Sequence, residues 1–131
     1  MTFVRPFLRP MLQIVDSLLA DLFRILSPTA VNQSDIFRCW GCLTDVFSNQ
    51  VLDFVIRRLD VLPGTSQVRV KSLRVLQYLI NYETEIIKDN SNLVLRSLLP
   101  LQSSTNLQIR LQLLNVAQDC FRNHPMPIYM T

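Results

Sequence analysis

The residues best suited to chemistry in this sequence are three cysteines and one histidine. Cys39 and Cys42 are spaced C-x2-C, and Cys120 and His124 are spaced C-x3-H, which are spacings that closed zinc sites use. We expect the two pairs to lie on helices that an intervening helix separates. With neighbouring helices about 8–10 Å apart, the gap between the pairs approaches about 20 Å, which is beyond the reach of metal ligands. The sequence therefore predicts no metal site.

A redox role for the C-x2-C pair also lacks its usual setting. A thioredoxin-type pair lies where a strand leads into a helix, whereas Cys39 and Cys42 are expected inside a helix that no strand precedes. Packing explains the residues between them, because the Trp40 indole fills core volume and Gly41 allows a neighbouring helix to approach closely. Aligning "SDIFRCWGC" with "SQVRVKSLR" places both cysteines where the later segment has basic residues. We therefore expect partly exposed thiols, and modification of them remains an open alternative.

The sequence has few other groups that could act in catalysis. Its only histidine, His124, lies in a predicted tail, so a histidine base would have to come from there. Gly41 and Gly64 are the only glycines, which excludes a glycine-rich phosphate loop. Glu83 and Glu85 are the only glutamates, and they point apart at a helix end. We predict a non-catalytic protein with no cofactor and no small-molecule substrate.

The composition is that of one globular domain covering residues 1–131. The chain is 49% hydrophobic and contains two glycines, which disfavours disorder. Thirteen Lys and Arg residues against ten Asp and Glu residues give a net charge of +3, an excess too small to indicate nucleic acid. Three cysteines cannot all pair within one chain, and no secretion signal is recognisable. We expect a cytoplasmic location, with the nucleus as the alternative.

Helical periodicity dominates the chain and is broken at short polar or proline-bearing joints. We predict an all-α fold of about six helices in three antiparallel pairs, roughly 10–47, 49–82 and 91–123, followed by a tail, 124–131. The first helix spans about residues 11–26. Its apolar stripe is predicted to be Ile14, Leu18, Leu22 and Ile25. The other helices are predicted at about 35–47, from 49 to just before Pro63, from 65 to about 82, at 92–101 and at 107–123.

The last two pairs are similar to each other. Laying "SQVRVKSLRVLQYLIN" over "NLQIRLQLLNVAQDCFR" places Val68 on Ile109 and Leu73 on Leu114. The offset of about 41 residues lies in the range of two-helix solenoid repeats. The sequence therefore predicts a stack of helical pairs.

The segment "SLLPLQSSTNLQIRLQLLNVA" resembles a HEAT repeat, with a late proline in its first helix and an aliphatic-Arg pair opening its second. The aspartate that usually precedes this pair is absent, so a ladder of Asp-Arg pairs between repeats is not expected. About two thirds of the chain, from "RCWGCLTDVFSNQVLDFVIRRL" through "VRVKSLRVLQYLIN" to "RNHP", is similar to the maestro heat-like repeat family. This resemblance implies an armadillo-like α-solenoid, as a short member or a fragment, and links to endolysosomal trafficking and reproductive tissue.

Stacked helical pairs create a long surface on their second helices, where a partner can bind. We predict a protein-interaction or scaffold module, with a protein as the partner. Lys71 and Arg74 would engage acidic groups, and Tyr78 would supply contact area. The alternative for such residues is an ordinary solvated face. The predicted contact stripe consists of Lys71, Arg74, Tyr78, Asn115, Asp119 and Arg122.

Two other surfaces carry hypotheses. The basic residues Arg57, Arg58 and Arg69, together with those of the stripe, bracket one helical hairpin and could meet an acidic protein, an anionic membrane or nucleic acid, of which a protein fits best. The amphipathic first helix, with Arg5 and Arg9, could instead lie on a membrane surface, endolysosomal by the resemblance. Its apolar residues are also where an uncapped stack would associate.

Overall fold

The computed structural model describes residues 5–27, 29, 31–59, 66–82 and 84–123, with the side chains of residues 5–8 and 84 outside the description. The predicted tail 124–131, and His124 with it, lies outside the described residues, as do Gly64 and Glu83. The elements in chain order are α1 (Arg5–Ile25), α2 (Gln33–Leu59), α3 (Ser66–Tyr82), α4 (Thr84–Asp89), α5 (Ser91–Leu98), the 3-10 helix η1 (Leu99–Ser103) and α6 (Leu107–Asn123). The predicted all-α class is confirmed, and the described residues form six α-helices with antiparallel packing contacts.

Several predicted boundaries differ from the structure, beginning with α1, which starts at Arg5 where about residue 11 was predicted. The second and third predicted helices form one element, α2, that kinks at Phe47, whose φ of −123° and ψ of 47° are not helical. We call residues 33–46 and 48–59 the first and second halves of α2. The predicted helix 92–101 is divided, because Pro100 has no amide hydrogen to donate and the chain tightens into η1. The short helix α4 was not predicted, since six residues are too few for a helical period to register.

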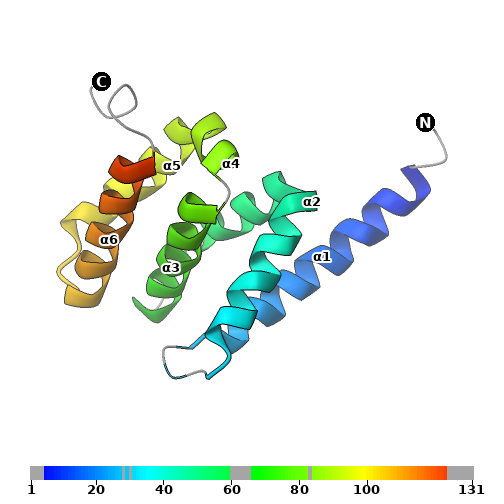
Figure 1. Ribbon diagram of the computed structural model, residues 1–131, viewed down its shortest axis with the longest axis horizontal. Helices are drawn as coiled ribbons and strands as arrows, with labels where there is room; N and C mark the ends of the chain where they lie inside the picture. The colour runs from blue at the N-terminus through cyan, green and yellow to red at the C-terminus, as the bar shows by residue number, and fades with distance from the viewer. Residues whose placement is uncertain (1–4, 28, 30, 60–65, 83, 124–131) are drawn as a thin grey trace.

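The four long helices lie side by side in the order α1, α2, α3, α6 (Figure 1). Helices that follow each other in the chain make antiparallel contacts, since α3 returns against the second half of α2 and α6 returns against α5 and η1. Trp40 is fully buried in the core that α1, α2 and α3 share, as predicted. A Cβ atom on Gly41 would lie 2.9 Å from Tyr78 Oη and 2.9 Å from a ring carbon of Tyr82, so glycine leaves room on α2 for these two rings of α3.

The apolar stripe predicted on α1 is mostly not the side that packs. Val15, Leu19 and Phe23 of α1, with Leu26 just beyond its end, are buried, whereas Ile14, Leu18 and Ile25 are exposed and Leu22 is partly buried. The second half of α2 selects the buried stripe. Phe54 packs edge-on against Phe23 at 5.9 Å between ring centroids, and Gln50 donates to the Leu12 carbonyl oxygen at 2.9 Å. Apolar residues cover more than one side of α1, and only this packing decides which side faces inward.

Contacts between the long helices recur at a nearly constant separation along the chain. Gln33 on α2 and Arg74 on α3 are 41 positions apart, and Phe37 and Tyr78 stack at the same separation. Between α3 and α6, Ser66 bonds to Asn106 at a separation of 40, and Asn81 to Asn123 at 42. A constant separation means that the first half of α2, α3 and α6 run in the same direction.

Within the described residues, no helix combines the length and the apolar character that crossing a membrane requires.

Candidate functional site

Lys71, the first residue of the predicted stripe, bridges two helices. Its Nζ donates to the carbonyl oxygens of Phe23 at 3.3 Å and Arg24 at 3.4 Å, which belong to the last turn of α1. These carbonyls have no partner within their own helix, and a cation near a helix C-terminus also opposes the negative end of the helix dipole. Lys71 therefore holds α1 to α3 with the ammonium group that was expected to bind an acidic partner.

Arg74 and Tyr78 are likewise engaged between α2 and α3. Arg74 Nη2 donates to Gln33 Oε1 at 2.5 Å. The Tyr78 ring stacks between Phe37, at 5.2 Å, and Tyr82, at 5.3 Å. Burial raises the pKa of the Tyr78 phenol above its ordinary value. Both side chains are half-buried, and their observed contacts stabilise the packing of the two helices.

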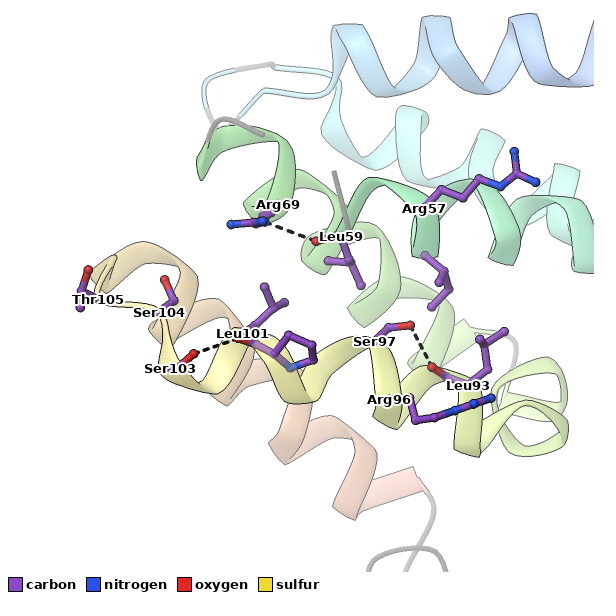
Figure 2. A pocket seen from close by; sticks show the side chains of 12 residues that line it. Arg57, Leu59, Arg69, Leu93, Arg96, Ser97, Leu101, Ser103, Ser104 and Thr105 are labelled. Atoms are coloured by element: carbon purple, nitrogen blue, oxygen red, sulfur yellow. Dashed lines mark hydrogen bonds between the residues drawn. The ribbon is translucent and has the colours of Figure 1, made fainter. Parts of the chain in front are cut away.

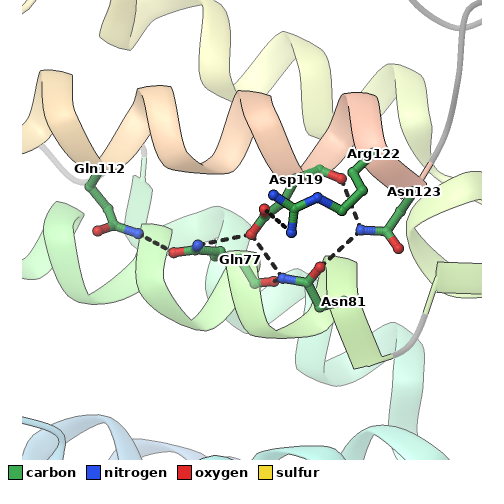
Figure 3. Close-up of polar contacts among 6 residues, drawn as sticks. All are labelled: Gln77, Asn81, Gln112, Asp119, Arg122 and Asn123. Carbon is green, nitrogen blue, oxygen red and sulfur yellow. Dashed lines mark hydrogen bonds and ion pairs between the residues drawn. The ribbon is translucent and has the colours of Figure 1, made fainter.

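Asp119 lies buried between α3 and α6, although it was predicted to face outward. Its Oδ2 accepts hydrogen bonds from Gln77 Nε2 and Asn81 Nδ2, both at 2.8 Å, and its Oδ1 pairs with Arg122 Nη1 at 3.3 Å. The bond from Asn81 is the main cause that lowers the pKa of Asp119, and those from Gln77 and Arg122 act in the same direction. We define the interhelix ladder (Figure 3) as Gln77, Asn81, Gln112, Asp119, Arg122 and Asn123.

The rest of the stripe on α6 is exposed but divided. Asn115 faces solvent, and Arg122 is exposed while its guanidinium pairs with Asp119. The stripe therefore does not form a continuous solvent-facing surface, because the polar groups on the facing sides of α3 and α6 bond to each other. Sequence reasoning took these polar side chains as outward ones, since nothing in the sequence distinguishes a solvated amide from one that bonds to the next helix.

Cys39 and Cys42 are exposed on the first half of α2, and Cys120 is buried in α6. Within the described residues, no three His, Cys, Asp or Glu side chains gather as a metal site would need. Because His124 lies outside the description, the absence of a zinc site stays a prediction.

We predict that N-ethylmaleimide alkylates two thiols rapidly in the native protein, because a buried thiol reacts only when the structure opens. Intact-mass measurements over time should show two fast additions and a third that appears in denaturant. The double variant Cys39→Ser, Cys42→Ser should lose both fast additions. Rapid native alkylation of Cys120 would contradict the burial of that thiol.

A separate cluster of cations lines a groove between α2, α3, α5 and η1 (Figure 2). We call it the arginine groove; its volume is about 840 Å³, which lies in the range of ligand-binding clefts. Arg57 comes from the second half of α2, Arg69 from the first turn of α3, and Arg96 from α5. The apolar lining is Ile56, Leu59, Leu93, Pro100 and Leu101, and the hydroxyl-bearing lining is Ser97, Ser103, Ser104 and Thr105.

The three arginines are oriented by the scaffold. Arg69 Nε donates to the Leu59 carbonyl oxygen at 3.3 Å, Arg96 Nε donates to the Asn92 carbonyl oxygen at 3.4 Å, and Arg57 Nε pairs with Asp53 at 3.0 Å. Figure 2 shows Arg69 and Leu101 toward one end of the groove and Arg57 and Arg96 toward the other. The groove therefore carries guanidinium groups toward both ends of an apolar floor, and that of Arg57 is paired with Asp53.

Arg57 and Arg69 belonged to the basic hairpin that the sequence analysis singled out, whereas Arg96 was missed. Arg96 has no basic neighbour in the sequence. It joins the other two only because α5 packs beside α2. The one available signal was the helical-pair pattern itself, which places α5 next to the second half of α2.

Comparison with known proteins gives no match to a family model, a curated protein or a solved structure. The fold and the groove define a small all-helical protein with a cation-lined cleft.

Proposed function

We propose that the chain is a HEAT-like helical repeat of the maestro heat-like type, an α-solenoid that acts as a non-catalytic protein-interaction and scaffold module. The residue resemblance supports the family. The contacts that recur at separations of 40–42 positions support the repeat, because stacked helical pairs place equivalent residues of neighbouring repeats against each other. Location in the cytoplasm, with the nucleus or an endolysosomal membrane surface as alternatives, belongs to the same proposal.

The arginine groove is the partner site in this proposal, and an extended acidic segment of another protein is its occupant. The observation that carries the proposal is the placement of Arg57, Arg69 and Arg96 around an apolar floor. Guanidinium groups bind carboxylates through paired N–H donors, and the floor accommodates apolar side chains between the acidic ones. The hydroxyl groups beside η1 can bond to the backbone of an extended chain.

Other ligand classes fit the groove less well. Single-stranded nucleic acid is held by stacking of its bases on aromatic rings, and the described lining contains no aromatic residue. The same lining contains no histidine, cysteine or carboxylate to act as a general base or nucleophile. The residues present therefore favour recognition of a charged peptide over catalysis.

We predict that a fluorescent peptide with leucines between pairs of glutamates binds the intact protein, and that Arg69→Glu with Arg96→Glu weakens binding at least tenfold, about 1.4 kcal/mol. Fluorescence anisotropy at low and high salt measures this, and affinity should fall with salt. The matched control is Arg24→Glu with Arg38→Glu, which changes the net charge equally at two exposed positions outside the groove. If both pairs of substitutions reduce peptide affinity equally, binding depends on net charge and the groove is not the binding site.

A second function is favoured by one observation. The exposed side of α1 carries Met11, Ile14, Leu18 and Ile25, which is the arrangement of a helix that lies on a membrane surface. This alternative predicts that Leu18→Glu weakens cosedimentation with anionic vesicles. Unchanged cosedimentation of the variant would contradict it.

A further inference from the structure

The turn that joins η1 to α6 carries three consecutive hydroxyl groups, those of Ser103, Ser104 and Thr105, which line one end of the arginine groove (Figure 2). Ser103 Oγ donates to the Pro100 carbonyl oxygen at 3.2 Å. Ser104 Oγ accepts a hydrogen bond from the Asn106 amide at 3.2 Å. Thr105 is exposed, and within the described residues its hydroxyl makes no hydrogen bond. The first two hydroxyls therefore hold the turn, whereas that of Thr105 has no such role.

The turn is also accessible to an enzyme that modifies side chains. Residues 104–106 are not helical, and the backbone of Ser104 is extended, with φ of −64° and ψ of 137°. Exposed connections of this kind are where enzymes that act on other proteins gain access to the chain. Ser97, a further hydroxyl-bearing residue of the groove, lies within α5, where its Oγ donates to the Leu93 carbonyl oxygen at 2.9 Å. Thr105 is therefore the hydroxyl of the groove that is best placed for modification.

The start of α6 favours a negative charge beside Thr105. This residue lies two positions before Leu107, the first residue of α6. The amides of a first helical turn have no acceptor within their own helix, and the positive end of the helix dipole lies there. Asn106 Oδ1 accepts a hydrogen bond from the Ile109 amide at 3.1 Å, which satisfies one of these amides. A phosphate on Thr105 would lie beside the others.

Two guanidinium groups belong to the same end of the groove. Arg110 Nη1 donates to the Ser104 carbonyl oxygen at 3.4 Å, so this group lies beside the peptide bond that joins Ser104 to Thr105. Arg69 lines the groove together with the turn, and Figure 2 shows it toward the end where Thr105 lies. Guanidinium groups bind phosphate through paired N–H donors, and a phosphorylated threonine opposite arginines forms new charge-assisted hydrogen bonds. The arginines and the helix terminus therefore point independently to the same ligand, a phosphate.

We propose that a serine/threonine protein kinase phosphorylates Thr105, and that the phosphate binds at the Arg69 end of the arginine groove and weakens the binding of acidic peptides there. In this step Thr105 Oγ1 attacks the γ-phosphorus of ATP, an O–P bond to threonine forms as the bond to ADP breaks, and the hydroxyl proton passes to a base of the kinase. The effect on peptide binding rests on the function proposed above, whereas the phosphorylation and the contacts of the phosphate do not.

Charge determines the direction of the effect on peptide binding. A threonine phosphate carries a charge of about −1.5 to −2 at pH 7. Beside Arg69, it occupies donors that the glutamates of a peptide would use, and it repels those glutamates. Phosphorylation therefore lowers the affinity of the groove for acidic peptides.

Mass spectrometry tests for the modification itself. The chain is isolated from cells that express it, with phosphatase inhibitors present, and is digested with trypsin. Cleavage after Arg96 and Arg110 releases residues 97–110 as one peptide. Fragment ions should place a phosphate on Thr105. A peptide found only in its unmodified form, or with phosphate only on its serines, overturns the proposal.

Phosphoserine incorporated genetically at position 105 tests the effect on binding, with Thr105→Ser as the reference. Fluorescence anisotropy with the glutamate-leucine peptide should show binding that is weaker by about tenfold or more in the phosphorylated chain. The matched control is phosphoserine at Ser34, an exposed residue in the first turn of α2 and outside the groove, which adds the same charge. This control should lower the affinity far less. Equal affinities of the phosphorylated and reference chains, or equal losses at the two positions, overturn the proposal.

Thermal unfolding separates the contacts of the phosphate from peptide binding. Phosphoserine at position 105 should raise the unfolding midpoint relative to Thr105→Ser, and Arg110→Gln should remove most of that rise because it removes a guanidinium partner of the phosphate. No rise, or a rise that Arg110→Gln leaves intact, overturns the placement of the phosphate. If the reference chain binds no peptide, the proposed function fails, and the mass spectra and melting curves still decide the phosphorylation.

Discussion

Replacing Trp40 by alanine is expected to lower the free energy of unfolding by about 3–5 kcal/mol, the usual cost of removing a large aromatic side chain from a core. Trp40 is fully buried, and its ring lies 5.9 Å from that of Phe54, so its loss leaves a cavity where the two halves of α2 meet α1 and α3. Domains of this size are stable by only about 5–15 kcal/mol. The substitution therefore removes a large fraction of the total.

Urea unfolding followed by far-UV circular dichroism measures this effect without relying on tryptophan fluorescence. Val46→Ala is the control, because Val46 lies in the same half of α2 and is 72% exposed. Its effect should stay within about 0.5 kcal/mol. A loss of less than about 1 kcal/mol for Trp40→Ala would mean that the indole is not packed as the structure describes.

Asp119→Ala is expected to cost about 2–3 kcal/mol, because it removes the charged acceptor that Gln77 Nε2 and Asn81 Nδ2 share between α3 and α6. Asp35→Ala is the control. The carboxylate of Asp35 is exposed and lies 3.9 Å from Arg38, and exposed pairs of this kind contribute about 0–1 kcal/mol. Urea unfolding at neutral pH compares the two variants, and equal effects would contradict a stabilising role for the interhelix ladder.

The Asp119 carboxylate also predicts that the free energy of unfolding depends on pH. Hydrogen bonding, chiefly from Asn81, lowers the pKa of Asp119 in the folded state, so the unfolded chain binds the proton more readily. The stabilisation is fully present above the unfolded value of about 3.9 and is lost as the pH falls through the lower folded pKa. A plot of the free energy of unfolding against pH across this acidic range should have a smaller slope for Asp119→Asn than for the intact chain. Equal slopes would contradict a lowered pKa for Asp119.

Helical periodicity was sufficient to predict the long helices, because apolar residues recur at the helical period between clear breaks. It failed where packing against another helix decides which side is buried or where a helix ends. On α1, apolar residues occupy adjacent stripes, and the choice between the one with Leu19 and the one with Leu18 depends on how α2 packs. At Phe47 a predicted break became a kink, because the chain continues as a helix beyond it.

The site was harder to predict than the fold. Lys71 and Asp119 were recognised as polar residues on the second helices, but whether such residues meet solvent or the next helix depends on contacts between residues about forty positions apart. The arginine groove likewise depends on contacts between residues far apart in the sequence. Arg57, Arg69 and Arg96 come from three helices, and no local pattern of the sequence connects Arg96 with the other two.

The most direct test of the proposed peptide-binding role is a titration of the isotopically labelled protein with the glutamate-leucine peptide, followed by amide chemical shifts. Binding in the arginine groove should shift the amides of Arg69, Ser97 and Leu101 in a saturable way while the outer side of α6 stays unchanged. Shifts that instead follow Lys71, Arg74 and Asn115 would return the site to the stripe predicted from the sequence. No saturable shift anywhere would contradict a role in binding acidic peptides.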